Sequence, residues 1–318
     1  MGWRLTLVQP ALFMVAIGVS LFRYSDDCPR GNYADLKDPR ESEPRSLATE
    51  VCKSVRNALS SSATWILSYQ YACSFGVEIM VHNVLSLYYY DDFTKADCDP
   101  SRDASQCRLL TQTTAGLISS LFGLMCVFAR AAGGYASDIA SLSHGLNGRT
   151  WVHFGALACE AVLLLLYGRT TDLSWSIGYL LAFGFFVQAC TGTTFAVVPY
   201  VLPPRYTGAV SGVVGAGGNI GAMVWGFLFK AVGNRADAFR QLSVFVGVAA
   251  LLTLLIDLGD DGEATDWTLR ATGIGIPTPR DDEDDSQLSQ SRSSGDYDQS
   301  SNCDSPRDGP RKGSAVHL

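Results

Sequence analysis

The sequence predicts an all-α membrane protein with seven membrane spans and a polar C-terminal tail. Hydrophobic residues make up 47% of the 318 residues and charged residues 17%, and the charge lies mostly outside a series of long apolar runs. Each run is about as long as a helix that crosses the hydrocarbon core of a bilayer. The predicted spans are 5–22, 64–90, 112–136, 151–167, 175–198, 208–232 and 241–257.

The first run, 5–22, is either a signal peptide or a true span. It contains Pro10 and ends in Leu21-Phe22-Arg23 without a small-residue cleavage pattern, so we interpret it as a span. The runs 151–167 and 241–257 are short for a span and are expected to extend into their flanks.

The polar segments give an orientation. Segment 23–63 carries seven Lys and Arg residues, which places it in the cytoplasm because cytoplasmic loops are enriched in basic residues. Alternation then puts 91–111 outside, 137–150 inside and the tail inside. We therefore expect a span at 1–22, a cytoplasmic loop at 23–63, a six-helix unit at 64–257 and a disordered acidic cytoplasmic tail at 258–318.

Six of the nine cysteines lie in predicted spans or in the segment 91–111. Those within spans are expected to pack as small hydrophobic residues. Cys98 and Cys107 share the loop assigned to the outside, where a disulfide and two free thiols are both open readings. The span cysteines are Cys73, Cys126, Cys159 and Cys190.

The segment Gly212-Val-Val-Gly-Ala-Gly-Gly-Asn-Ile-Gly-Ala222 places five glycines and one amide, Asn219, in an apolar run. Small residues let helices approach closely in lipid, and a buried amide there needs a partner. The segment is either a glycine-packed helix crossing or part of a site.

Arg130 lies in an apolar helix, eight residues before Asp138, so about 12 Å from the cytoplasmic end at 1.5 Å per residue. Its guanidinium fork suits a small planar oxyanion. The alternative is that Arg130 extends its side chain to the cytoplasmic surface.

Other polar residues in the spans are candidates for function by default. Glu78 and His82 are four residues apart on one helical face, as a buried pair or a proton relay. Tyr71 and Phe75 share the same spacing, for packing or for a site. Two isolated polar side chains are expected to be satisfied by neighbouring helices; they are Glu160 and Gln188.

Several segments, in order along the chain, resemble the nitrate/nitrite porter family of the major facilitator superfamily, especially its high-affinity nitrate transporters. They are Tyr71-Ala-Cys-Ser-Phe-Gly-Val-Glu78, Phe128-Ala-Arg130, Gly133-Gly-Tyr-Ala-Ser-Asp138, Gly148-Arg149-Thr-Trp151, Gly192-Thr-Thr-Phe195 and Gly215-Ala-Gly-Gly-Asn-Ile-Gly221. The resemblance covers residues 1 to about 257.

The resemblance implies a twelve-helix transporter of two six-helix halves, of which this chain supplies helices 6–12. The first five helices are missing, so the chain is expected to be a fragment that depends on an N-terminal half or a complementary chain. The implied activity is nitrate or nitrite transport across the plasma membrane by alternating access, with protons as the coupling ion and the lipid bilayer as surroundings.

The resemblance also implies roles for single residues. Arg130 would pair with the anion, and Asn219 would lie beside the central cavity. Tyr71 and Phe75 would sandwich the planar anion. Glu78 or His82 would take part in the proton step. The signature glycines, which would allow helix sliding, are Gly215, Gly217, Gly218 and Gly221.

The sequence carries no metal cluster, nucleophile–base set or phosphate loop, so we expect no enzyme, no cofactor and no nucleic-acid partner. Seven spans also suggest a receptor, but the motifs are those of transporters. Two functions stay open: the second half of a nitrate transporter, or a non-transporting regulatory or nitrate-sensing membrane protein that signals through its tail.

Overall fold

The computed structural model describes residues 2–25, 47–95 and 107–256. The regular secondary structure of this part is helical apart from one bridge between Thr94 and Arg108, which confirms an all-α fold for the described residues. Helix α1 spans Gly2–Tyr24, and its side chains from Val8 onward are exposed. The predicted tail, 258–318, and Cys98 lie outside the described residues.

Helix α2, Leu47–Ser60, lies in the segment that we expected to be a loop. The sequence analysis did not predict this helix because the segment was judged on its charge, whereas its apolar residues recur at helical spacing; the cytoplasmic position of the segment stays a prediction. Ser61 then caps α3, Ser62–Tyr71, by accepting a hydrogen bond from the Thr64 amide at 3.4 Å. A π-helical turn, Ala72–Gly76, leads directly into α4, Val77–Asp91.

Helix α6, Gln112–Leu124, begins with a capping box between Thr111 and Thr114. A 3₁₀ turn, Met125–Val127, leads into α7, Ala129–Tyr167. Helix α7 is broken at Gly145, whose φ of 58° lies in the left-handed region that favours glycine.

The break in α7 separates the two predicted runs 112–136 and 151–167. Across it, Arg149 donates to Asp138 at 2.6 Å. The guanidinium of Arg149 also lies 5.1 Å from the centre of the Tyr200 ring.

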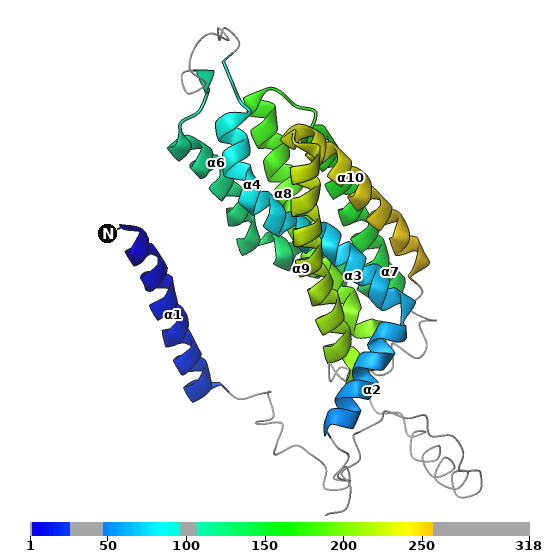
Figure 1. Cartoon of the computed structure of the whole chain (residues 1–318). Helices are drawn as coiled ribbons and strands as arrows, with labels where there is room; N and C mark the ends of the chain where they lie inside the picture. The colour runs from blue at the N-terminus through cyan, green and yellow to red at the C-terminus, as the bar shows by residue number, and fades with distance from the viewer. Residues whose placement is uncertain (1, 26–46, 96–106, 257–318) are drawn as a thin grey trace, which may run out of the picture. The chain divides into compact units, whose positions relative to one another are not determined.

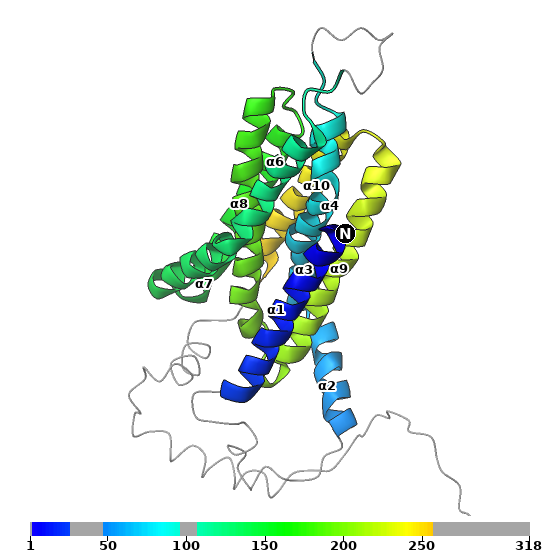
Figure 2. The same ribbon diagram turned by 90° about the vertical axis from the view of Figure 1, so that its left-hand side faces the viewer.

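Helix α8, Leu173–Val197, packs along α7 (Figure 2). Helix α9, Thr207–Val232, crosses α3 and the π turn, and α10, Arg235–Leu252, packs against α7 (Figure 1). Gly233, with φ 75°, joins α9 to α10. The glycine-rich helix therefore lies against the helix that carries Tyr71, Phe75 and Glu78.

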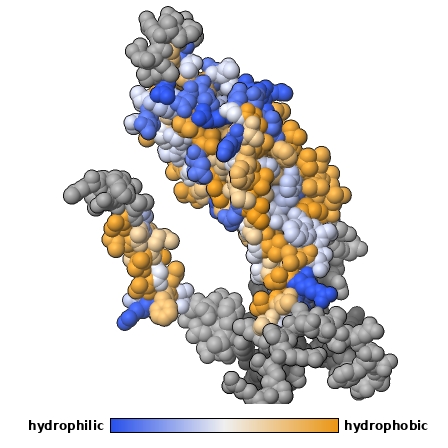
Figure 3. Space-filling model, viewed as in Figure 1, coloured by the Kyte–Doolittle hydropathy of each residue, from blue (hydrophilic) through white to orange (hydrophobic). Residues whose placement is uncertain are grey.

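Four segments of the described chain are long and apolar enough to cross a membrane. Large apolar side chains such as Phe227 and Val248 are exposed on α9 and α10, and Figure 3 shows hydrophobic residues over this face. Such a surface is expected where side chains contact lipid. The four segments are Gln112–Tyr167, Leu173–Tyr200, Pro204–Val232 and Arg235–Leu255.

Glycines bring α7 and α8 into backbone contact. A methyl group on Gly192 would collide with the carbonyl oxygen of Arg130, and one on Gly133 with the carbonyl oxygen of Ala189.

We expect Gly192→Ala to destabilise the fold by ~1–3 kcal/mol, because the backbones of α7 and α8 must separate. Gly155→Ala is the matched control: it meets nothing within 4 Å and should be neutral or stabilising by up to about 1 kcal/mol. Thermal unfolding of the two purified variants checks this prediction, which equal midpoints would contradict.

Candidate functional site

An ion pair between α7 and α4 lies at the centre of the candidate site. Nη2 of Arg130 donates to both carboxylate oxygens of Glu78 at 2.8 Å. The Glu78 side chain is buried, with 5% exposed, whereas 41% of the Arg130 side chain is exposed. The thiol of Cys126 donates to Oε1 of the same carboxylate at 3.2 Å. One side of the Arg130 guanidinium therefore contacts the buried carboxylate of Glu78. We call its other, exposed side the open front.

The helix break before α7 sets the position of Arg130. Phe128 has φ −131° and ψ −25°, outside the helical region, so the chain changes direction two residues before Arg130. Nε of Arg130 is buried and has no hydrogen-bond partner among the described residues. The guanidinium thus retains donors for another acceptor.

Aromatic rings flank this open front. The Tyr71 and Phe75 rings stack, with their centres 5.0 Å apart and 9° between their planes. Phe195 of α8 meets Tyr71 edge-on at 5.2 Å. The Arg130 guanidinium carbon lies 5.7 Å from the centre of the Phe75 ring. The structure therefore brings Arg130, Tyr71, Phe75 and Glu78 together.

The glycines of α9 explain how these rings fit. A methyl group on Gly218 would lie 2.5 Å from Tyr71 Cδ1 and 2.8 Å from Phe75 Cδ1. One on Gly221 would lie 2.5 Å from the Ala72 Cβ, and one on Gly217 would collide with Ser68. Gly215 instead meets nothing within 4 Å. Three of the four signature glycines are thus contact positions in this structure, and a role for Gly215 in helix sliding stays a prediction.

Asn219 is not the buried amide that the sequence suggested. Its side chain is exposed, and its Nδ2 donates to the carbonyl oxygen of Gly215 in the same helix, at 3.0 Å. The apolar residues around Asn219 suggested that its side chain is buried, but it lies on the face of α9 opposite the contacts with α3. A role for Asn219 at the substrate stays a prediction.

In the described residues Glu78 makes its hydrogen bonds with residues other than His82, and a proton relay between Glu78 and His82 stays a prediction. Glu78 bonds Arg130 and Cys126, while His82 is exposed and meets the Phe122 ring edge-on at 4.9 Å. Possible ligand atoms of Glu78, His82 and Cys126 lie within 4.8 Å of one another. Because Arg130 already neutralises this carboxylate, we assign no metal ligand there.

A buried polar network that the sequence reasoning missed joins four helices. His153 of α7 bonds Thr193 of α8 through Nδ1 at 2.7 Å and Gln70 of α3 through Nε2 at 3.2 Å. The Gln70 amide nitrogen donates to the Ala249 carbonyl at 3.0 Å and to the Thr253 hydroxyl at 2.8 Å. The Gln70 oxygen therefore faces His153, so Nε2 of His153 carries a proton. Only the presence of polar residues in apolar runs signalled this network.

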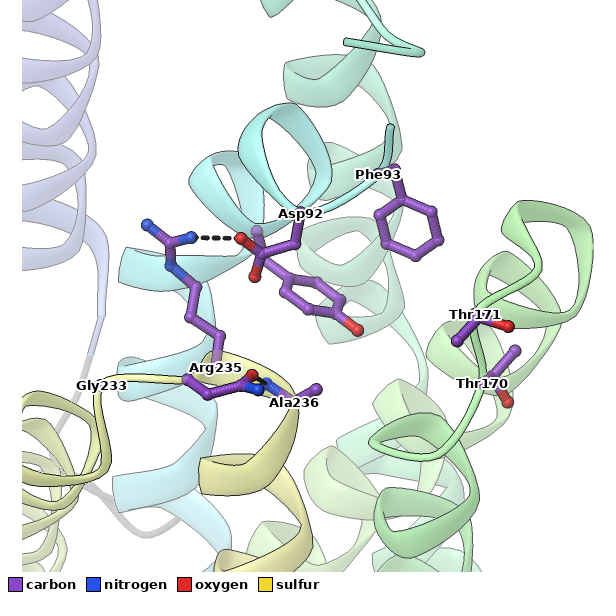
Figure 4. Close-up of a pocket in the computed structure, with 9 residues that line it drawn as sticks. Asp92, Phe93, Thr170, Thr171, Gly233, Arg235 and Ala236 are labelled. Carbon is purple, nitrogen blue, oxygen red and sulfur yellow. Dashed lines mark hydrogen bonds and ion pairs between the residues drawn. The ribbon is translucent and has the colours of Figure 1, made fainter. Parts of the chain in front are cut away.

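A separate pocket of about 420 Å³ lies where α4 ends, between the α7–α8 and α9–α10 connections (Figure 4). Arg235 closes one side by donating to Asp92 at 2.6 Å, and Thr170 and Thr171 line the other. Burial raises the pKa of Asp92, and Arg235 opposes that shift. The pocket shares no lining residue with the Arg130 cluster. Its ion pair joins the end of α4 to the start of α10.

Two further predictions concern cysteines. Cys107 is disulfide-bonded; because Cys98 lies outside the described residues, its pairing with Cys107 stays a prediction. Cys73 and Cys190 are buried, as expected, but Cys159 is exposed and Cys126 is a hydrogen-bond donor.

Comparison with known families agrees with this arrangement. Residues 1–226 match the sequence family described as the Major Facilitator Superfamily. The chain belongs to this superfamily. Its helical architecture and its apolar surface are those of an integral membrane protein of that superfamily, whose relatives below are transporters rather than enzymes.

Several relatives are named nitrate transporters. High affinity nitrate transporter 2.5 of Arabidopsis thaliana is 34% identical over 228 residues, which cover 72% of this chain and 41% of that protein. High affinity nitrate transporter 2.7 of the same plant is 33% identical over 269 residues, covering 81% and 50%. Nitrate transporter 2.2 of Chlamydomonas reinhardtii is 31% identical over 225 residues, covering 70% and 40%. The resemblance to nitrate/nitrite porters is thereby confirmed, and the chain spans half or less of the length of these relatives.

Proposed function

We propose that this chain is part of a nitrate transporter of the plasma membrane and that Arg130 binds the transported anion. The observation that carries the proposal is the guanidinium of Arg130, half-exposed on one side and held by buried Glu78 on the other. Nitrate is a planar monoanion, so it can accept parallel hydrogen bonds from a guanidinium fork. The stacked rings of Tyr71 and Phe75 offer flat surfaces beside it.

The same geometry supports proton coupling. Glu78 and nitrate are both anions that use the donors of Arg130, so they compete for it. A proton on Glu78 removes the competing charge and frees the fork for nitrate. Proton and anion therefore bind together. His82 makes no hydrogen bond to Glu78 among the described residues, so we assign the coupling proton to Glu78.

Coupling is needed on electrostatic grounds. Moving one negative charge into a cell that is negative inside costs about 2.3 kcal/mol for each 100 mV of potential. Accompanying protons offset this charge, so symport makes uptake favourable.

We further propose that the chain forms seven spans, equivalent to helices 6–12 of a twelve-helix transporter. The basis is its match to half or less of each relative's length. Ser62–Asp91 would add a span, through α3, the π turn and α4, to those that length and composition identify. In such transporters the substrate lies between the two halves, so the open front of Arg130 would face a complementary half.

The test is nitrate uptake in cells that lack their own high-affinity uptake. One strain expresses this chain, a second the part of Arabidopsis transporter 2.5 that this chain does not match, and a third both. We expect uptake only in the third strain. Absence of uptake there, with both polypeptides present in the membrane, contradicts the proposal. Nitrate binding by the chain alone, without uptake, would instead point to a sensor.

A further inference from the structure

A second acid lies in the bundle, apart from the ion pair. Glu160 belongs to the part of α7 that follows the break at Gly145, and its side chain is completely buried. Neither of its carboxyl oxygens has a hydrogen-bond partner in the part of the chain that the structure describes. The expectation that neighbouring helices satisfy Glu160 is therefore wrong, and such an orphaned buried group calls for an explanation.

The surroundings of Glu160 contain two thiols and one further acid. Cys190 of α8 and Cys73 of the π turn are its titratable neighbours, together with the charge of Glu78 on α4. The Cys190 thiol lies close enough to interact with the carboxyl, but neither carboxyl oxygen has a partner at hydrogen-bond distance and angle. Helix α10, which packs on the same part of α7, carries no titratable side chain between Arg240 and Leu252.

No ion pair between Glu160 and a basic side chain is present in the described part of the chain. Arg130, the cation of the neighbouring cluster, already gives its hydrogen bonds to Glu78. An unpaired carboxylate in apolar surroundings is far more costly than the neutral acid, and buried charges persist only when they are paired. Burial and the absence of a partner therefore both favour a bound proton.

We propose that Glu160 is a second proton-binding site of this helix bundle and that it holds its proton in the conformation described here. Complete burial without a hydrogen-bond partner favours this state. Release then means transfer of the proton from the carboxylic acid to water, which leaves a carboxylate when helix movement opens the α7–α8 contact. This step rests on the proposed function, whereas the bound proton itself does not.

The proton can be read directly by infrared spectroscopy of the purified chain in lipid nanodiscs at neutral pH. We expect a carbonyl band of a protonated carboxylic acid that disappears in Glu160→Gln. Asp138→Asn is the matched control: this carboxylate is 64% exposed and paired with Arg149, so its removal should leave the band unchanged. A wild-type spectrum without the band, or a band that survives in Glu160→Gln, overturns the proposal.

Glu160→Leu provides a second measurement that needs no signal from the acid. A neutral group without partners contributes no stabilising contact, so an apolar side chain of similar size should raise the midpoint of thermal unfolding. A large fall in the midpoint would mean that Glu160 is charged and paired, which would overturn the proposal. Neither measurement involves nitrate, so failure of nitrate uptake and failure of this inference can be told apart.

Discussion

Nitrate uptake is expected to be abolished when Arg130 is replaced by glutamine in the two-part system described above. The variant loses the charged donors that would hold the anion, and it leaves the buried carboxylate of Glu78 without its partner. A hydrogen bond to a charged group contributes about 1.5–3 kcal/mol, so losing two of them should weaken nitrate binding by roughly hundredfold or more. Arg130→Lys keeps the charge but lacks the planar fork, so it should retain only a small part of the uptake.

Uptake at several nitrate concentrations checks this result, with the amount of each variant in the membrane measured in parallel. Arg108→Gln is the matched control, because Arg108 pairs with Asp91 and stacks on Tyr90 away from the cluster. It should leave uptake near the wild-type level. Wild-type uptake by Arg130→Gln would remove Arg130 from the binding site.

The parts of the site that the sequence could predict are those that depend on local spacing. Tyr71 and Phe75 are four residues apart, and helical spacing brings their rings together even though a π turn begins between them. Arg130 stands out because a charge in an apolar run is rare and needs a reason. The family resemblance then connected these two local signals.

The partners of these residues could not be predicted, because they come from distant parts of the chain. Glu78 meets Arg130, 52 positions away, rather than His82, four positions away. Helical spacing places Glu78 and His82 on neighbouring positions, but the attraction of a guanidinium and the helix packing decide which one the carboxylate contacts. The His153 network has the same character, since its bonds to Gln70 and Thr193 span 83 and 40 positions.

In an apolar segment, the sequence also could not predict which face of a helix is buried. Soluble helices reveal their buried face by an apolar stripe, whereas α9 is apolar all around. Asn219 and Gly218 are adjacent in sequence, yet only Gly218 contacts α3 and the π turn. Glu160 shows the converse: its side chain is completely buried, and no local pattern reveals this.

The second large effect is expected from Glu78→Gln. The neutral amide mimics a protonated Glu78 and leaves the fork of Arg130 free for the anion. Nitrate should therefore bind more tightly at neutral pH, and uptake should lose its dependence on pH because the group that couples proton and anion no longer titrates. Transport against a nitrate gradient should fall steeply, since the anion then moves without that proton.

Nitrate uptake by the Glu78→Gln strain across a range of external pH is the measurement. His82→Gln is the matched control, because His82 lies one helical turn further along α4 and makes no hydrogen bond to Glu78 in the structure. It should keep the wild-type pH profile. If Glu78→Gln keeps the full pH dependence while His82→Gln loses it, the exposed imidazole carries the coupling proton. In that case the ion pair with Arg130 serves only to position the guanidinium for nitrate.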